Sequence, residues 1–296
     1  MNRPWMLAFI HVIAIGLVST HSLAQADQLH SLRDAYQNKP LVLRGFYSGD
    51  VLHYDSSGSP VGSPTTGDWT TDGIVQLDSI TIADNHLSAS GNRLIVISYD
   101  NVFQFFVNHK LGRDQKPPRL AIEIDLLPSG ASEQEAAIAF SKIFLTSQDS
   151  FRDLVPEYWK YCVQDALSDS DEHCHFAKEF MAIPGFALGE RHGLWDGLPK
   201  NPVTIMRPGF SPARLVSLDR GCLTDSARNV KYRGVVDFVL VIDSEGRPSN
   251  VRILAPVGFG IDARAARALE SSKWKPAEIS GRPTAIVLTT QVDCTR

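Results

Sequence analysis

The chain has 296 residues, a formal net charge of −4 and 21% charged residues. Nucleic-acid binding needs clustered basic side chains that neutralise phosphates, and this composition has no basic excess, so it argues against a nucleic-acid partner. The length is sufficient for two domains, and the hydrophobic content of 43% is that of an ordinary globular protein.

The first 26 residues have the organisation of a secretory signal. Arg3 provides a positive charge, Trp5–Val18 is largely apolar, and Ala24-Gln25-Ala26 is a small-x-small cleavage motif. We therefore predict that residues 1–26 are removed and that the mature chain begins at Asp27. The alternative is an uncleaved membrane anchor, for which the apolar run is marginal because a span needs about 20 residues.

Four cysteines are expected to form disulfides if the chain is exported to an oxidising compartment. The sequence alone leaves three pairings open. In the pairing between neighbours, Cys162 bonds Cys174, and Cys222 bonds Cys294. Loop-closure entropy predicts that the second bridge stabilises the fold by about 4 kcal/mol and the shorter first bridge by about 3 kcal/mol.

Residues 27–127 carry mostly strand signals. Short branched or aromatic runs such as Ile74–Leu77 and Leu94–Ile97 are separated by turn clusters rich in Gly, Ser, Asp and Pro. Residues 121–126 alternate between apolar and polar side chains, as expected for a half-buried strand. Frequent turns between short strands predict a β-rich domain of the sandwich or barrel type.

Residues 128–183 are predicted to be helical. Ser132 and Glu135 form a capping-box pattern, so a helix is expected to begin there. A second helix is expected over Phe151–Val163, with Pro156 bending it or marking its true start. The first helix should bury one apolar face, which contains Ala136, Phe140, Ile143 and Phe144.

A Pro- and Gly-rich stretch, residues 184–212, is predicted to be an extended, partly ordered linker to a C-terminal domain over residues 213–296. In that domain Thr224 is a favourable N-cap for a helix that Gly234 ends. Residues 235–242 form a strand, and a tight turn with Gly246 leads to its antiparallel partner.

The remainder of this domain predicts a second helix and a third strand. Asp262 opens the helix, whose apolar positions include Leu269 and Trp274, and Pro276 ends it. Gly281-Arg282-Pro283 is a turn before a valine-rich strand. Three antiparallel strands with two helices on one face would bury a single core, so the predicted fold class is α+β.

The order of these motifs resembles the C-terminal domain of TonB-type energy transducers. The matching features include the Ser-Ala-Arg helix that ends at Gly234, the Asp243-x-x-Gly246-Arg turn, and the Trp274-Lys-Pro276 sequence. The Tyr-Pro pair usual before the first helix is replaced by residues 221–223. The resemblance covers under a third of the chain and implies a three-stranded module in the periplasm.

The resemblance also implies a function. Such domains bind outer-membrane transporters when an extended segment of the transporter pairs with an edge strand of the domain. We therefore expect a non-enzymatic periplasmic protein without a cofactor, whose partner is a TonB-dependent transporter or another envelope protein. The same edge can alternatively be used in a homodimer. The strand expected to pair contains Ala285, Ile286, Val287, Leu288, Thr289, Thr290, Gln291 and Val292.

Two other functions are alternatives. An uncleaved N-terminus would make the chain a membrane-anchored energy transducer. The β-rich half could instead bind a ligand or carry an enzymatic activity, with the C-terminal domain as its docking module. Its candidate residues have equally good roles in the core or in turns, and the sequence shows no nucleophile elbow of the Gly-x-Ser-x-Gly type. These candidates are Tyr47, His53, Tyr54 and Trp69.

Two short motifs are interpreted structurally rather than chemically. His173-Cys174-His175, with Asp171 and Glu172, has metal-binding side chains but no further ligand at a usual spacing, so a disulfide cysteine is expected there and no metal. Gly258-x-Gly260 lacks the third glycine of a phosphate-binding loop, so it is expected to end a strand. Lys273, Lys275 and Arg282 are expected to be solvated.

Overall fold

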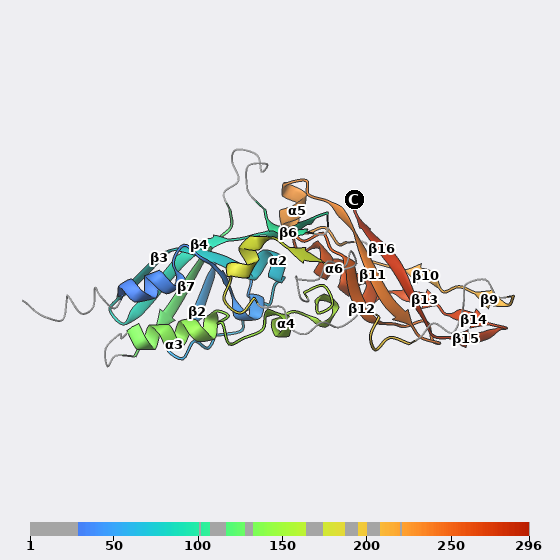
Figure 1. The fold of residues 1–296 in the computed structure, drawn as a ribbon, viewed down its shortest axis with the longest axis horizontal. Coiled ribbons are helices and arrows are strands. Elements are labelled where there is room, and N and C mark those ends of the chain that lie inside the picture. The colour runs from blue at the N-terminus through green and yellow to red at the C-terminus, as the bar shows by residue number, and fades with distance from the viewer. Residues whose placement is uncertain are drawn as a thin grey trace, which may run out of the picture.

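The computed structural model describes residues 29–100, 102–106, 117–127, 133–163, 174–186, 195–199, 208–219 and 221–295. The molecule is elongated, with the N-terminal half at one end and the C-terminal sheet towards the other (Figure 1). The predicted signal sequence lies outside the described residues. Within the ranges given above, no helix is both long and apolar enough to cross a bilayer.

The N-terminal half is organised around a five-stranded sheet of order β1-β3-β4-β7-β2. All neighbouring strands are antiparallel except β2 and β7, which are parallel. The sheet is open, because β1 and β2 at its two edges do not pair with each other. Its strands are β1 (Pro40–Val42), β2 (Val51–Tyr54), β3 (Ile74–Ala83), β4 (His86–Arg93) and β7 (Arg119–Asp125).

A core forms where helices pack against this sheet. The helix over residues 29–36 and α3 (Glu133–Ile143) contact each other through Tyr36 and Phe140, whose ring centroids are 4.9 Å apart. The apolar face predicted for α3 is confirmed, since Ala136, Phe140, Ile143 and Phe144 are all buried. The β-rich character of this half is also confirmed, and its arrangement is an open sheet covered by helices.

A second, smaller sheet connects the two halves. It contains β5 (Val96–Tyr99), β6 (Val102–Phe105) and β8 (His175–Phe176) in that order. Beside it lies an aromatic core in which Trp69 of α2 (Trp69–Asp72) packs edge-on against Phe103 and Trp159, with ring centroids 5.5 Å and 5.2 Å away. Burying aromatic side chains of this size contributes a large share of the packing energy at the centre of the molecule.

The helix predicted over Phe151–Val163 is wrong as a continuous element. The structure has a short α4 (Phe151–Leu154) and a 3₁₀ turn, η3 (Glu157–Trp159), because Pro156 between them cannot continue a helix. Another 3₁₀ segment, η4 (Lys178–Ala182), follows β8. Cys162 and Cys174 form a disulfide that joins these segments.

The C-terminal module has the predicted three-stranded sheet. Its order is β12-β11-β16, and both pairings are antiparallel. Thr224 caps α5 as predicted, since its hydroxyl accepts the N–H of Ala227 at 3.1 Å. The elements are α5 (Asp225–Asn229), β11 (Gly234–Ile242), β12 (Pro248–Ala255), α6 (Ile261–Glu270) and β16 (Ile286–Cys294).

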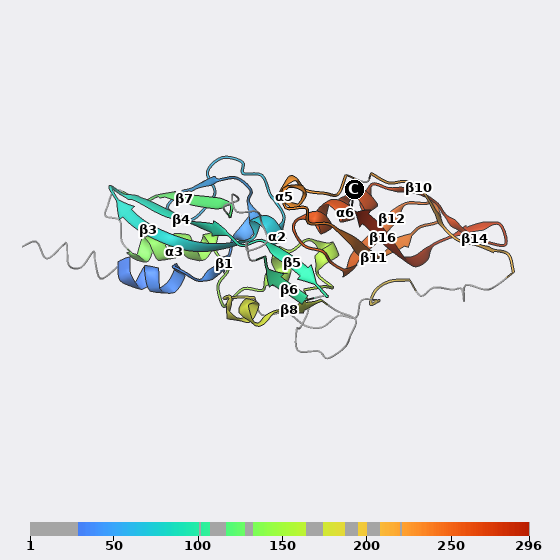
Figure 2. The same cartoon turned by 90° about the horizontal axis from the view of Figure 1, so that it is seen from above.

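The prediction that Trp274 lies in the second helix is wrong. The helix α6 ends at Glu270, and Trp274 lies in β13 (Lys273–Lys275), which pairs with β10 (Arg214–Ser217). Beyond it, β14 (Ala277–Ile279) pairs with β15 (Arg282–Thr284) and with β9 (Phe210–Ser211). Figure 2 shows β14 at the far end of the molecule.

The module is joined to the N-terminal half by backbone hydrogen bonds. The loop after β12 lies along β5, where Ser98 N–H donates to the Val257 carbonyl at 2.9 Å and Phe259 N–H donates to the Val96 carbonyl at 2.8 Å. The same apolar core continues through both halves, from Trp69 to Phe238. The two parts therefore share a core and are more than tethered neighbours.

The side chain of Asp262 stabilises this junction through hydrogen bonds to the loop after β12. Its side chain is fully buried and accepts the N–H groups of Val257 at 2.7 Å and Gly258 at 2.5 Å. Burial, together with a smaller effect of the nearby Asp68 carboxylate, raises the pKa of Asp262 to about 7. Asp68 is partly buried, and loss of hydration raises its pKa as well.

This burial gives a testable dependence of stability on pH. The ordinary pKa of an aspartate is 3.8, so between pH 3.8 and about 7 the folded chain holds a proton on Asp262 that the unfolded chain releases. The free energy of unfolding should therefore fall as pH rises through this window, by at most about 1.4 kcal/mol per pH unit. Urea unfolding of the wild type and Asp262→Asn at several pH values measures it. Parallel curves for the two proteins would show that Asp262 is already ionised when folded.

Candidate functional site

The strand predicted to bind a partner is an edge strand of the C-terminal sheet. β16 pairs with β11 over its whole length, from Ile286 opposite Ile242 to Cys294 opposite Gly234. Among the strands that the structure describes, none pairs with the other side of β16. Of the predicted residues, Ile286 to Val292 lie within β16, and Ala285 immediately precedes it. An edge strand of this length is a template for pairing with another extended segment.

The side chains of β16 alternate between two different surroundings. Ile286 is buried, and Leu288 packs against the main core on the side of α6. Val287 points to the opposite face of the sheet, where it joins Val239 and Val241 in a small separate core. Both faces of the strand therefore have apolar surroundings at this end, although strand pairing uses only the backbone.

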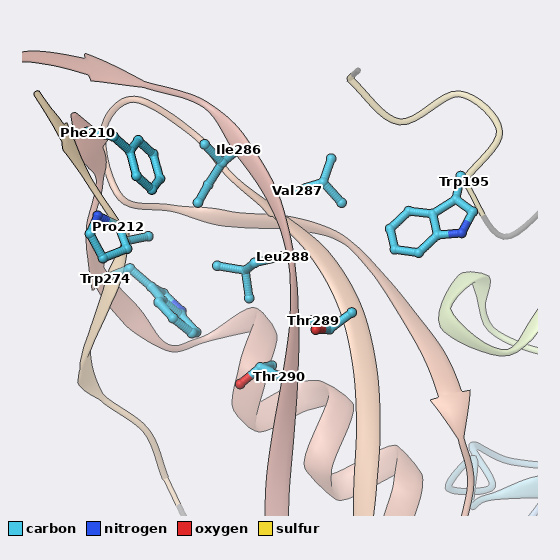
Figure 3. Close-up of a pocket in the computed structure, with 10 residues that line it drawn as sticks. Trp195, Phe210, Pro212, Trp274, Ile286, Val287, Leu288, Thr289 and Thr290 are labelled. Carbon is cyan, nitrogen blue, oxygen red and sulfur yellow. The ribbon is translucent and has the colours of Figure 1, made fainter. Parts of the chain in front are cut away.

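A groove of about 460 Å³ runs beside this end of β16. Figure 3 shows that Ile286 and Leu288 lie on the same side of the strand as Phe210 and Trp274. On the other side, Val287 and Thr289 lie towards Trp195. The lining residues are Trp195, Phe210, Pro212, Ala213, Trp274 and Ile286, Val287, Leu288, Thr289 and Thr290.

The wall that contains Trp195 comes from the stretch predicted to be a linker. Leu198 packs against the small core formed by Val239, Val241 and Val287. The Arg252 guanidinium donates to the Asp196 carbonyl at 2.8 Å, and it also lies over the Tyr161 ring at 3.7 Å. These contacts fix residues 195–199 on the face of the sheet opposite α6, and they hold Trp195, half of whose surface is exposed, beside β16.

The opposite wall is built by short strands. Phe210 lies in β9, which is paired with β14, and Trp274 lies in β13, which is paired with β10. The Trp274 indole donates to the Ser272 hydroxyl at 2.7 Å, and its backbone N–H donates to the Gly246 carbonyl at 3.2 Å. Trp274 thus has two roles, since it packs against the main core and also lines the groove.

The groove is uncharged, but one rim is basic. None of its lining residues carries a charge. On the rim next to Trp274, Arg214 lies opposite Lys275 in the pairing of β10 with β13, and both side chains are exposed. Lys275 Nζ also lies 3.5 Å from the Glu278 carboxylate. Lys273 and Arg282 are exposed too, as predicted.

The other residues that the sequence offers as candidates do not line a second groove of similar size among the described residues. Cys174 is in a disulfide, and His173 lies outside the described residues; among those described, no three metal-binding side chains gather. Trp69 is a core residue. Tyr47, His53 and Tyr54 border a cleft of about 240 Å³ beside β2. The hydroxyl of Tyr54 is buried, and burial raises its pKa well above the ordinary value.

Sequence reasoning identifies the edge strand but misses Trp195, Phe210 and Pro212. All three fall within residues 184–212, for which the Pro and Gly content predicts a linker. An apolar residue in a predicted linker has no periodic neighbours that would assign it to a face. The sequence offers one signal for these residues, which is the presence of large aromatic side chains in a stretch where a solvated linker would not need them.

Residues 224–293 match the family model described as Gram-negative bacterial TonB protein C-terminal. The matched region runs from Thr224, the N-cap of α5, almost to the end of β16, and it contains the edge strand. Trp195 and Phe210 lie upstream of it. A search of curated proteins finds no match to the chain. The family match confirms that the C-terminal segment of this chain is similar to the TonB C-terminal domain.

Proposed function

We propose that this protein is a periplasmic binding protein that recruits an extended segment of an envelope protein to β16 by strand addition. The observation that carries the proposal is the edge position of β16 within a module that matches the TonB C-terminal family. In strand addition, main-chain hydrogen bonds supply affinity and flanking pockets supply selectivity. The role is binding rather than catalysis, and the partner class is an outer-membrane TonB-dependent transporter.

The junction between the two halves favours a fixed binding platform over a tethered one. The module shares its core with the N-terminal half, and the loop at residues 257–259 is hydrogen-bonded to β5. A transducer that spans the periplasm needs a long flexible connection before its binding module. Here a folded half of the protein precedes the module and packs against it, which supports local presentation of β16.

The experiment uses the whole mature chain, because the module is not independent of the rest. Peptides copied from the N-terminal segments of TonB-dependent transporters are titrated into isotope-labelled protein, and backbone amide shifts are recorded. We expect shifts along Ile286–Val292 and along β11, which pairs with it. The matched control is β12, the opposite edge of the same sheet, whose amides should stay unchanged.

Two outcomes would contradict this proposal. Absence of any shift along β16 at millimolar peptide would exclude strand addition there. Shifts confined to β12 would place the interface on the opposite edge of the sheet from β16. If β16 amides shift with protein concentration before any peptide is added, the edge is used between two copies of the chain, which is the competing homodimer.

A further inference from the structure

We propose that residues 195–199, here called the Trp195 turn, autoinhibit the C-terminal module, and that a partner pairs with β16 only after this turn is displaced. This role rests on the proposed function, because it regulates access to the same strand. The Trp195 turn packs on the face of the sheet opposite α6. It lies outside the matched family region, which begins at residue 224.

The Trp195 turn covers an apolar part of the C-terminal sheet. Val239 and Val241 of β11 and Val287 of β16 each have at most 6% of their surface exposed. The half-buried side chain of Leu198 packs against these three valines. Displacing the turn would expose part of their surface to water, so the closed arrangement is favoured until another segment covers them.

Trp195 lies where a paired strand would place its side chains. Neighbouring strands are about 4.8 Å apart, and alternate side chains of an added strand would lie on the face of the sheet to which Val287 points. On that face Trp195 lines the groove beside Val287 and Thr289 (Figure 3). The indole ring and an added strand therefore compete for the same space, and the turn has to move first.

The two walls of the groove are held in different ways. Phe210 and Trp274 belong to strands that are paired with β14 and β10. Within the described ranges, residues 195–199 belong to no helix or strand, and all of them except Leu198 are exposed. Segments with few buried apolar side chains open at a low free-energy cost. The Trp195 turn is therefore the wall that a partner displaces.

Two features of the turn can be changed without touching β16. Gly197 has a φ of +71°, and apart from its chain neighbours no described residue has an atom within 4 Å of the position of a Cβ atom there. Alanine at this position strains the turn without a collision, whereas asparagine adopts this conformation more readily. Leu198→Ser removes the apolar contact instead. Gly197→Ala and Leu198→Ser thus release the turn in different ways, and Gly197→Asn is the matched control.

The test uses isotope-labelled residues 27–296 and peptides copied from the N-terminal segments of TonB-dependent transporters. The indole N–H signal of Trp195, identified by Trp195→Phe, reports the position of the turn before any peptide is added. It should move in both releasing variants and stay in place in Gly197→Asn. In the wild type it should move in the same direction when the peptide saturates the protein.

Releasing the turn should tighten peptide binding about tenfold in Gly197→Ala and in Leu198→Ser, as measured from the β16 amide shifts. This is the expected factor if the turn is closed in about nine of ten wild-type molecules, because only the open molecules bind. Gly197→Asn should bind the peptide as the wild type does. Unchanged amide signals of α6, on the opposite face of the sheet, would show that the variants keep the fold.

Equal affinity of the wild type and both releasing variants, or weaker binding by the variants, would overturn the inference and leave the proposed function standing. A Trp195 signal that stays in place while the peptide shifts the β16 amides would have the same meaning. If the peptides shift these amides in none of the proteins, including the released variants, the proposed function fails and the inference fails with it. Binding by the released variants alone would support both.

Discussion

Substituting alanine for Gly258 should lower the free energy of unfolding by about 3–5 kcal/mol, because the added methyl group collides with the neighbouring backbone. Gly258 has a φ of +85°, and a Cβ atom there would lie 2.5 Å from the Val96 carbonyl oxygen and 2.6 Å from the Ile97 Cα atom. These are backbone atoms of β5, so they cannot rotate away. The strand must move and break the hydrogen bonds at Ser98 and Phe259.

Gly281→Ala is the matched control for this prediction. Gly281 has a similar φ of +76°, but apart from its two chain neighbours no other residue has an atom within 4 Å of the position that a Cβ atom would take there. Its substitution should therefore cost only the conformational strain, about 1–2 kcal/mol. Urea unfolding of both variants measures the difference, and hydrogen exchange at the Ser98 amide localises it to the junction. Equal losses in the two variants would mean that the halves are not tightly joined.

Removing the disulfide between Cys222 and Cys294 should cost about 4 kcal/mol of stability by loop-closure entropy. The bridge joins Cys222 to Cys294, the last residue of β16. The two cysteines are 72 positions apart in the sequence, and both are buried. It thus encloses the module and fixes the end of the proposed binding strand. The double substitution Cys222→Ala with Cys294→Ala should also accelerate amide exchange at the C-terminal end of β16.

The second disulfide provides the comparison. Cys162 and Cys174 are separated by only 12 positions, so their joint replacement by alanine should cost about 3 kcal/mol. It should leave exchange in β16 unchanged, because neither cysteine belongs to the module. A loss from this pair equal to or larger than that from Cys222 and Cys294 would contradict the ranking by loop length.

The C-terminal module is largely predictable from sequence, since its signals are local. Thr224 as a cap, Gly246 in a turn and the branched residues of β11 each act within a few positions of the chain. The connection of Cys222 with Cys294 is one of three pairings that the sequence leaves open, and the structure selects it. The family match covers the same region.

The incorrect and missing predictions involve contacts that are distant in sequence. Trp274 continues the helical spacing of α6, but pairing of β13 with β10 places it in a strand. Leu198 packs on residues of β11 and β16 that are distant in the sequence, and no local sequence pattern predicts that contact. The groove could therefore not be derived from sequence, although the edge strand that forms its floor could.

Hydrogen exchange of residues 27–296, with and without a peptide copied from the N-terminal segment of a TonB-dependent transporter, tests the central claim most directly. Strand addition predicts that amides between Ile286 and Val292 exchange more slowly when the peptide is bound, while amides of β12 exchange at their original rates. Slower exchange along β12, or no change along β16 at saturating peptide, would contradict the claim that this edge is the binding surface.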